Sequence, residues 1–311
     1  METLAMSSLN IVFWASDKPR EIMLAKALAD GARRRGDTLE IRRTGDYGET
    51  DNGDDLKYPG PTPDTDVACC FGVKGKSRQI IEDHLAVGKS TLFFDKGYSR
   101  QGGEGGHTEY SRISVNGSDP LTYFMLDDRP DDRFNKLKVE PQKRRTHPNN
   151  GTVLICGSSE KYHAFHSLDH PTDYADRLMR RIRKQTDRQI VYRPKPSWKN
   201  AKAITGAALS TGSQSIKDAL RSCHVLVTHG SAAAMDAILA GVPAIVLGNS
   251  IARPVAETFL ENLENPFWPP NHLLQRWCNA MAYTQWSTEE LRTGEAWTEL
   301  KREILRQKKL A

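Results

Sequence analysis

Continuous apolar runs alternate along this chain with segments in which apolar residues return at helical spacing. In the first half the runs are short and uninterrupted, as expected of strands buried on both faces. Strands are predicted at residues 9–15, 38–43, 66–73, 90–95 and 111–117. Helices are predicted at 20–36, capped by Ser16 or Asp17 and with Pro19 in the first turn, and at 77–88.

The second half repeats the same alternation. Strands are predicted at 151–160, 188–196, 224–230 and 242–249. Helices are predicted at 172–186, 215–223, 231–241 and 254–263. Strands that alternate with helices indicate parallel sheets covered on both faces.

The segment between the two halves is of a different kind. Residues 127–150 are charged, contain prolines and show no periodicity, so we expect an interdomain linker. This divides the chain into an N-terminal Rossmann-like domain (1–126), a second Rossmann-like domain (151–270) and C-terminal helices (271–311) that pack back across both. The predicted fold is α/β, with the two Rossmann-like domains facing a cleft.

Composition supports a soluble globular protein. The chain has 311 residues, of which 38% are hydrophobic and 27% charged. No apolar run is long enough to span a bilayer, and the N-terminus lacks the regions of a signal peptide, so we expect a cytoplasmic protein without a membrane partner. Five cysteines without a C-x-x-C pair predict reduced, buried thiols. Trp277, Trp286 and Trp297 are expected to be packing anchors, and Ser287 with Glu290 fits a capping box.

Positive charge is modest in total but clustered. The formal net charge is +5, and basic runs occur at 33–35, 42–43, 143–145 and 180–184. These runs are interpreted either as solvated helix and loop faces or as a surface for a polyanion such as nucleic acid. The net charge alone does not decide between these two interpretations.

Candidate chemistry lies in the turns that follow strands, because open α/β sheets bind ligands beyond the carboxyl ends of their strands. His229, Gly230, Ser231 and Ala232 form one such turn, whose free N–H groups are expected to hold a phosphate. Asp236, on the helix that follows, would accept hydrogen bonds from ribose hydroxyls. The alternative is a serine-capped helix that packs closely on the sheet.

Two further turns fit the same interpretation. Arg193 and Lys195 follow a strand between stiffening prolines, and two fixed cations suit a diphosphate. Gly157, Ser158 and Ser159 allow close approach to a phosphate. For the turn that carries Arg193 and Lys195, the alternative interpretation is a charged surface turn without a ligand.

The histidines near the third turn do not predict a metal site. His163, His166 and His170 fit no zinc spacing with enough ligands, and no cysteine pair accompanies them. The Asp64–Asp66 stretch precedes a strand and is interpreted as a turn rather than as a metal-binding D-x-D motif.

These turns together resemble a known family. Residues 150–260 are similar to the donor-binding domain of GT-B glycosyltransferases, above all over 229–248. The turn at 192–196 resembles the R-P-H-P turn of capsule-type transferases and CDP-glycerol-type polymerases, with Lys195 where that family has histidine. Residues 93–98, 109–117 and 285–297 resemble glycosyltransferase-like proteins of bacteriophages, some of which attach sugars to hydroxymethylated bases in DNA.

The resemblance implies a nucleotide-sugar donor, with a UDP-sugar as first choice, bound by the three turns. It implies no required metal, because helix N-termini and cations stabilise the departing diphosphate. A transferase also needs a base for the acceptor hydroxyl. Asp95, at the end of a strand, is the first choice, with Asp17, Glu104 and His107 as rivals. The 102–107 stretch would close over the acceptor.

The predicted acceptor is 5-hydroxymethylpyrimidine in phage DNA, which would make DNA a partner and the host cytoplasm the location. Transfer to a glycan or polyol phosphate, or epimerisation of a nucleotide sugar, would use the same fold. A non-catalytic nucleotide- or DNA-binding module is the third alternative. The sequence assigns no oligomeric state.

Overall fold

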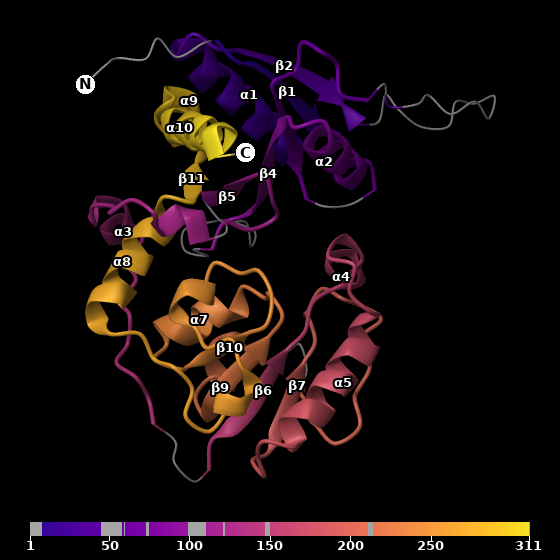
Figure 1. The fold of residues 1–311 in the computed structure, drawn as a ribbon, viewed down its shortest axis with the longest axis vertical. Helices are drawn as coiled ribbons and strands as arrows, with labels where there is room; N and C mark the ends of the chain where they lie inside the picture. The colour runs from indigo at the N-terminus through magenta and orange to yellow at the C-terminus, as the bar shows by residue number, and fades with distance from the viewer. Residues whose placement is uncertain are drawn as a thin grey trace, which may run out of the picture. The chain divides into compact units, whose positions relative to one another are not determined.

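A computed structural model of the chain describes residues 8–44, 58, 60–72, 75–98, 110–120, 122–146, 150–210 and 214–310. The chain forms two compact units (Figure 1). Unit 1 comprises residues 1–118 and 284–311, and unit 2 comprises residues 119–283. The boundaries predicted at 126, 150 and 270 therefore all fall inside unit 2.

Unit 1 is built around a six-stranded sheet in the order β11-β5-β4-β3-β1-β2. Its elements are β1 (Asn10–Ala15), α1 (Pro19–Arg34), β2 (Thr38–Arg43), β3 (Val67–Phe71), α2 (Lys76–Ala86), β4 (Ser90–Lys96), β5 (Tyr110–Val115), β11 (Gln285–Ser287), α9 (Thr288–Thr293) and α10 (Glu295–Leu310). The first four strands are parallel, as predicted, whereas β5 runs antiparallel to both of its neighbours, β4 and β11. The strand at 285–287 lies in a segment predicted to be largely helical.

The chain winds outward from the centre of the parallel part of the sheet in two directions. From β1 it passes through α1 to β2 at one edge, and from β3 it passes through α2 to β4, which lies on the far side of β3 from β1. Right-handed crossovers therefore put α1 and α2 on opposite faces of the sheet. The α2 face buries Val12, Trp14, Cys70, Ile81 and other apolar side chains. The carboxyl ends of β1 and β3 form the switch point, where ligands bind in sheets of this order.

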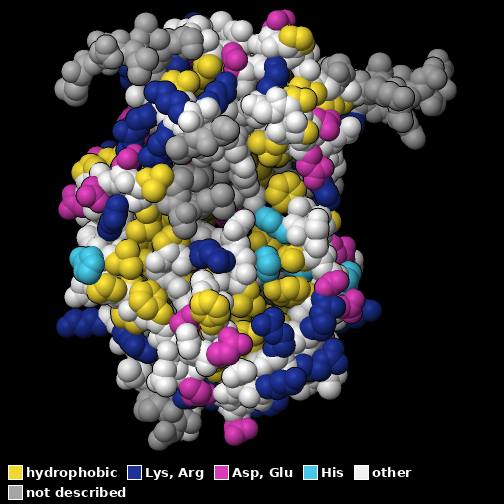
Figure 2. Space-filling model, in the orientation of Figure 1, with side chains coloured by type: hydrophobic (Ala, Val, Ile, Leu, Met, Phe, Trp, Pro, Cys, Tyr) yellow, Lys and Arg dark blue, Asp and Glu magenta, His cyan; other side chains and the backbone are white. Residues whose placement is uncertain are grey.

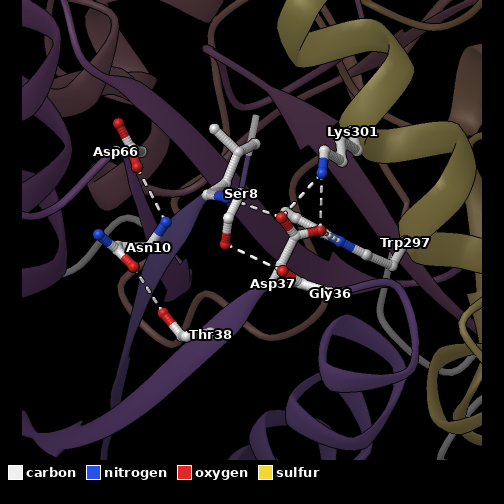
Figure 3. A network of polar contacts seen from close by, with 9 residues as sticks. Ser8, Asn10, Gly36, Asp37, Thr38, Asp66, Trp297 and Lys301 are labelled. Carbon is white, nitrogen blue, oxygen red and sulfur yellow. Dashed lines mark hydrogen bonds and ion pairs between the residues drawn. The ribbon is translucent and has the colours of Figure 1, made fainter. Parts of the chain in front are cut away.

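A buried ion pair connects the last helix of unit 1 to its first strands (Figure 3). The Asp37 carboxylate accepts from Lys301 Nζ at 2.8 and 3.0 Å and from Trp297 Nε1 at 2.6 Å. The backbone N–H of Leu9 donates to the same carboxylate at 2.7 Å. Because the Lys301 and Asp37 side chains are 3% and 0% exposed, the pair is shielded from water. It holds α10 against the turn that leads into β2.

The ends of two helices test the capping predictions. Lys18 precedes α1 and makes no side-chain cap, so the prediction of Ser16 or Asp17 as cap is wrong. Glu21, buried in the first turn, instead accepts from the Ser16 N–H at 2.9 Å and so ties down this end of the helix. The capping box of Ser287 with Glu290 is confirmed at the start of α9. Trp277, Trp286 and Trp297 are buried, which confirms them as packing anchors.

Unit 2 carries a five-stranded sheet, all parallel, in the order β10-β9-β6-β7-β8. Its elements are the 3-10 helix η3 (Thr122–Met125), α3 (Asp132–Lys136), β6 (Thr152–Cys156), α4 (Glu160–Phe165), α5 (Pro171–Arg183), β7 (Ile190–Arg193), β8 (Ala208–Leu209), α6 (Ile216–Ala219), β9 (Cys223–Thr228), α7 (Ala233–Leu239), β10 (Ala244–Val246), the 3-10 helices η4 (Arg253–Val255) and η5 (Leu260–Asn262), and α8 (Asn271–Ala282). Numbered by their order in the chain, these strands read 5-4-1-2-3. This is the doubly wound Rossmann order, with its switch point between β6 and β9.

Two predictions for this half of the chain need correction. The helix predicted at 254–263 is wrong, because only η4 and η5 form there. Glu257 pairs with Ile245 beside β10, and its carboxylate accepts from the Thr258, Phe259 and Phe267 N–H groups. These contacts hold the segment extended. The predicted linker at 127–150 contains α3, which packs on α8.

All five cysteines are buried and free, as predicted. None of the helices in the described ranges combines the length and apolarity that crossing a membrane requires.

Candidate functional site

The turns singled out from the sequence meet at the switch point of unit 2. Gly157–Ser159 follow β6 and His229–Ser231 follow β9, and these strands are hydrogen-bonded neighbours. The two turns are tied to each other through Thr228, at the end of β9. Its hydroxyl donates to the Cys156 carbonyl at 2.8 Å and accepts from the Ser231 N–H at 3.1 Å. The structure therefore brings both predicted turns to one place.

The turn after β6 requires a glycine at its first position. A Cβ on Gly157 would lie 3.0 Å from the hydroxyl of Tyr192, which is fully buried beneath it. Among the described residues that hydroxyl has no hydrogen-bond partner, and burial raises the pKa of Tyr192 to about 12. Ser158, next along the turn, is also buried. The floor of the site thus contains a neutral phenol directed at the turn.

Arg193 brings a buried positive charge to the same edge. It ends β7, and its carbonyl accepts from the Gly157 N–H at 2.9 Å. Its side chain, in a residue only 8% exposed, donates to the Ser210 hydroxyl at 3.1 Å. No ion pair with a carboxylate is found for it within the described ranges. A buried guanidinium that is held by a hydroxyl rather than by an acid is suited to an anionic ligand.

His229 lies in a cluster of imidazole and phenol rings. The Tyr174 hydroxyl is 2.9 Å from His229 Nδ1, and the two rings meet edge to face. On its other side His229 packs against Gly248, where a Cβ would lie 2.2 Å from Nε2. The Gly248 N–H also donates to the His229 carbonyl at 2.7 Å. The ring is therefore fixed from both sides.

α4 adds a second layer to this cluster. A Cβ on Gly230 would lie 2.0 Å from the Tyr162 hydroxyl, so the turn after β9 is in close contact with α4. The rings of Tyr162 and His166 pack at a tilt of 43° with centroids 4.2 Å apart, and the ring centroids of His166 and His229 are 6.4 Å apart. Figure 2 shows histidine side chains gathered near α4. His163 is buried, and its Nδ1 is 2.6 Å from the Asp169 carbonyl, which only accepts, so Nδ1 carries a proton.

Burial and crowding keep these histidines neutral at physiological pH. Burial, with smaller effects of His166, His163 and Arg253, lowers the pKa of His229 to about 4. Burial and His170 lower the pKa of His163 to about 4. A neutral imidazole donates a single hydrogen bond, so His229 would contribute a directed N–H rather than a charge.

The remaining predicted donor-site residues lie around this core. Lys195 is exposed just beyond β7. Asp236 is half-buried on α7. Burial raises the pKa of the Cys156 thiol to about 12, while the nearby Arg193 lowers it and Asp236 raises it by smaller amounts. Ala232 precedes α7, and Ser231 Oγ accepts from the Ala233 N–H at 3.3 Å. Because α7 has only seven residues, its dipole would contribute little to the binding of an anion, and hydrogen bonds from individual backbone N–H groups would contribute more.

The candidate bases belong to unit 1. Asp17 follows β1 at the switch point of that sheet, and its side chain is 88% exposed with an ion pair to Arg43 at 3.1 Å. Asp95 lies near the end of β4 with both oxygens engaged. Oδ2 accepts from Arg112 at 2.9 Å and Oδ1 from the Lys96 N–H at 2.7 Å. His107 and Glu104, with the 102–107 stretch, lie outside the described residues.

No grouping of three or more histidine, cysteine, aspartate or glutamate side chains arranged to hold a metal ion occurs in the described part of the chain. Asp66, from the D-x-D-like stretch, accepts from the Asn10 N–H at 2.9 Å beside β1.

Sequence reasoning missed several residues of the unit 2 site. Tyr162 and Tyr174 were not singled out, although both lie at helical spacing from the histidines that were. Gly248 lies near the end of the strand predicted at 242–249 and has no role assigned from the sequence. Arg253 lowers the pKa of His229 and donates to the Gly248 carbonyl at 3.0 Å. The only sequence signal for it was its position shortly after a predicted strand.

Comparison with solved structures identifies the fold. The KpsC β-Kdo 2,4 transferase of Thermosulfurimonas dismutans aligns over 96% of this chain and 98% of its own, with 11% identity and a TM-score of 0.52. The KpsC β-Kdo 2,7 transferase of the same organism aligns over 94% and 100%, with 11% identity and a TM-score of 0.50. No protein-family model and no curated protein sequence matches the chain.

At this identity the likeness concerns the fold alone. It extends over nearly the whole chain and includes both units. With the strand orders given above, it shows a GT-B fold with two Rossmann-like domains, as predicted.

Proposed function

We propose that the protein transfers a sugar from a nucleotide-sugar donor to an acceptor hydroxyl, and that unit 2 binds the nucleotide. The observation that carries the proposal is the convergence of two small-residue turns and a buried arginine at one switch point. The GT-B fold supports it, because the two KpsC proteins that share this fold are by name Kdo transferases.

The donor diphosphate would be bound by the turns after β6, β7 and β9. Backbone N–H groups of Gly157–Ser159 and Gly230–Ser231 would donate to phosphate oxygens. Arg193 and Lys195 would neutralise the charge that develops on the leaving diphosphate. Neutral His229, oriented by Tyr174, would add a directed hydrogen bond. Such fixed donors stabilise a leaving group without reorganising during the reaction.

Asp236 would accept from the ribose hydroxyls of the donor. Asp17 is the better placed of the two described candidate bases. It lies at the switch point of unit 1 and is largely exposed, whereas both oxygens of Asp95 already accept hydrogen bonds. A general base must reach the hydroxyl proton with a free oxygen. Asp95 and His107 stay predictions for the same role.

The donor is tested by equilibrium binding of nucleoside diphosphates to the full chain, beginning with UDP, with and without a chelator. Binding in the tens to hundreds of micromolar range is expected, and undiminished binding with the chelator would support a metal-independent site. Arg193→Gln should weaken binding about tenfold or more, since hydrogen bonds to charged groups contribute about 1.5–3 kcal/mol.

Arg221 provides a matched control. It is an exposed arginine at the opposite edge of the same sheet, before β9, where it pairs with Asp218. Arg221→Gln should leave nucleotide binding unchanged. The proposal is abandoned if no nucleotide binds, or if Arg193→Gln and Arg221→Gln have equal effects.

The acceptor remains a prediction. Incubation with a panel of nucleotide sugars and hydroxymethylated DNA, a glycan or a polyol phosphate would separate the acceptor classes. Sugar appearing on the DNA bases would support the phage-type role. Conversion of the nucleotide sugar to its epimer without any acceptor would instead indicate an epimerase.

A further inference from the structure

A third turn, residues 248–253, borders the unit 2 site on the side of β10. The Gly248 N–H donates to the His229 carbonyl at 2.7 Å, so the pairing of β9 with β10 continues beyond the end of β10. The Asn249 carbonyl oxygen then lies 2.5 Å from the point where a Cβ on Gly230 would be. The turn after β10 therefore packs directly on the turn after β9.

Buried contacts hold this third turn in place. Ile251 and Ala252 are 0% exposed, and the Ile251 carbonyl accepts from the buried Trp277 Nε1 at 2.7 Å. The Arg253 N–H donates to the Ser250 carbonyl at 3.1 Å, which closes the turn. The backbone that carries Arg253 is thus anchored in the core, although Arg253 itself is exposed.

The side chain of Arg253 lies beside the ring of His229. One guanidinium nitrogen donates to the Gly248 carbonyl at 3.0 Å, and the His229 ring packs on the same glycine, where a Cβ would lie 2.2 Å from Nε2. Arg253 also adds to the effect of burial in lowering the pKa of His229. Within the described ranges Arg253 forms no ion pair with a carboxylate, and the contact with Gly248 is its one side-chain hydrogen bond.

His229 presents a second donor at the same point. The Tyr174 hydroxyl is 2.9 Å from Nδ1, and when it donates there, the neutral imidazole carries its single proton on Nε2. Nε2 has no hydrogen-bond partner among the residues that the structure describes. A guanidinium and a neutral N–H that lie against one glycine suit the oxygens of a single anionic group.

We propose that Arg253, together with Nε2 of His229, binds one phosphate group of the donor. This assignment rests on the proposed function in calling the ligand a donor. It adds a cation on the β10 side of the switch point, whereas Arg193 and Lys195 lie on the β7 side. Because Arg253 is exposed, its attraction for a phosphate should depend on salt.

The test is calorimetric binding of UDP and of inorganic pyrophosphate to the full chain, at about 0.05 M and about 0.5 M salt. Arg253→Gln should weaken the binding of both ligands about fivefold at the lower salt concentration and about twofold or less at the higher one, because salt screens an exposed charge. Arg253→Lys keeps the charge and should bind both ligands within about twofold of the unsubstituted chain.

Arg144 provides a matched control. It is also an exposed arginine of unit 2 that donates to a backbone carbonyl, that of Pro266 at 3.3 Å. It lies near the amino end of β10, since the N–H of the next residue, Arg145, donates to the Gly241 carbonyl. Arg144→Gln should change the melting temperature about as little as Arg253→Gln does, and should leave the binding of both ligands unchanged.

The outcomes separate this proposal from the proposed function. A loss of affinity in Arg253→Gln that shrinks with salt supports the phosphate contact. An equal loss at both salt concentrations would show that Arg253 only holds Gly248 in place, and this result or no loss at all overturns the proposal. In either case, UDP binding that Arg193→Gln weakens leaves the proposed function standing.

The pyrophosphate measurements decide the case in which UDP does not bind. Binding of pyrophosphate alone, weakened by Arg253→Gln, would support the anion site at His229 and refute a nucleotide donor. Binding of neither ligand overturns both proposals.

Discussion

Replacing Asp37 by asparagine should destabilise unit 1 severely although the side chain keeps its size. The carboxylate receives four hydrogen bonds, two on each oxygen, from Leu9, Trp297 and Lys301. An amide would place its NH2 group against two of these donors in either orientation. It would also leave the Lys301 ammonium, which is 3% exposed, without a negative partner.

The expected loss follows from the burial of the pair. Removing one member of a buried ion pair costs about 3–5 kcal/mol, because the other charge stays desolvated. Domains are stable by only about 5–15 kcal/mol, so Asp37→Asn should remove about a fifth or more of the stability of unit 1. Adding Lys301→Met removes the buried ammonium that Asp37→Asn leaves without a negative partner, and should recover part of the lost stability.

Amide hydrogen exchange read by mass spectrometry suits a protein of two units, because it reports each unit separately. Peptides from 8–44 and 284–310 should lose protection in Asp37→Asn, while peptides from β6 and β9 should not. Asp66→Asn is the matched control. Its carboxylate accepts from the Asn10 N–H on the same strand but is only half-buried, so the change should cost under about 1 kcal/mol.

If Asp37→Asn destabilises unit 1 no more than Asp66→Asn does, the buried ion pair does not contribute as described. If the variant with both Asp37→Asn and Lys301→Met is as unstable as Asp37→Asn alone, the unpaired Lys301 charge is not the cause of the loss.

Three predictions concern unit 2. Gly248→Ala puts a methyl group 2.2 Å from His229 Nε2 and should lower UDP affinity about tenfold by calorimetry; unchanged affinity would contradict the role of His229. Tyr174→Phe removes the hydroxyl bonded to His229 and should weaken UDP binding about threefold to tenfold, with little change in melting temperature. Because folding lowers the pKa of His163 and His229 to about 4, the unfolded state takes up protons first. Stability should therefore fall as pH drops from 6.5 toward 4, by about 1.4 kcal/mol per pH unit for each proton, and His163→Gln should flatten this slope in denaturant titrations.

The position of the unit 2 site could be predicted because it depends on local pattern and on a general rule of topology. An apolar run followed by Gly157–Ser159 or His229–Ser231 identifies the carboxyl end of a strand, and parallel sheets bring such ends together. The sequence did not order the strands. The 5-4-1-2-3 order was needed to show that these two turns, and not another pair, border the switch point.

What could not be predicted depends on contacts between distant segments. β11 pairs with β5 across more than half the chain, so no local pattern marked it as a strand of the first unit. The contacts of Tyr174 and Gly248 with His229 likewise join three different elements. The prediction of a helix at 254–263 was wrong for the same reason. Glu257 pairs with Ile245, and the spacing of apolar residues within the segment contains no information about this contact.

The two sheet edges differ in how they hold charge, and this difference determines how strongly salt would affect each edge. The unit 2 edge combines neutral histidines, a buried phenol and one buried guanidinium, so it offers fixed donors with little free charge. Such a site would select its ligand by geometry. At the unit 1 edge the Asp17–Arg43 and Asp95–Arg112 ion pairs lie nearer to solvent, so salt screens them more strongly. Rising ionic strength should therefore weaken these two ion pairs more than it weakens the binding of a nucleotide at Arg193.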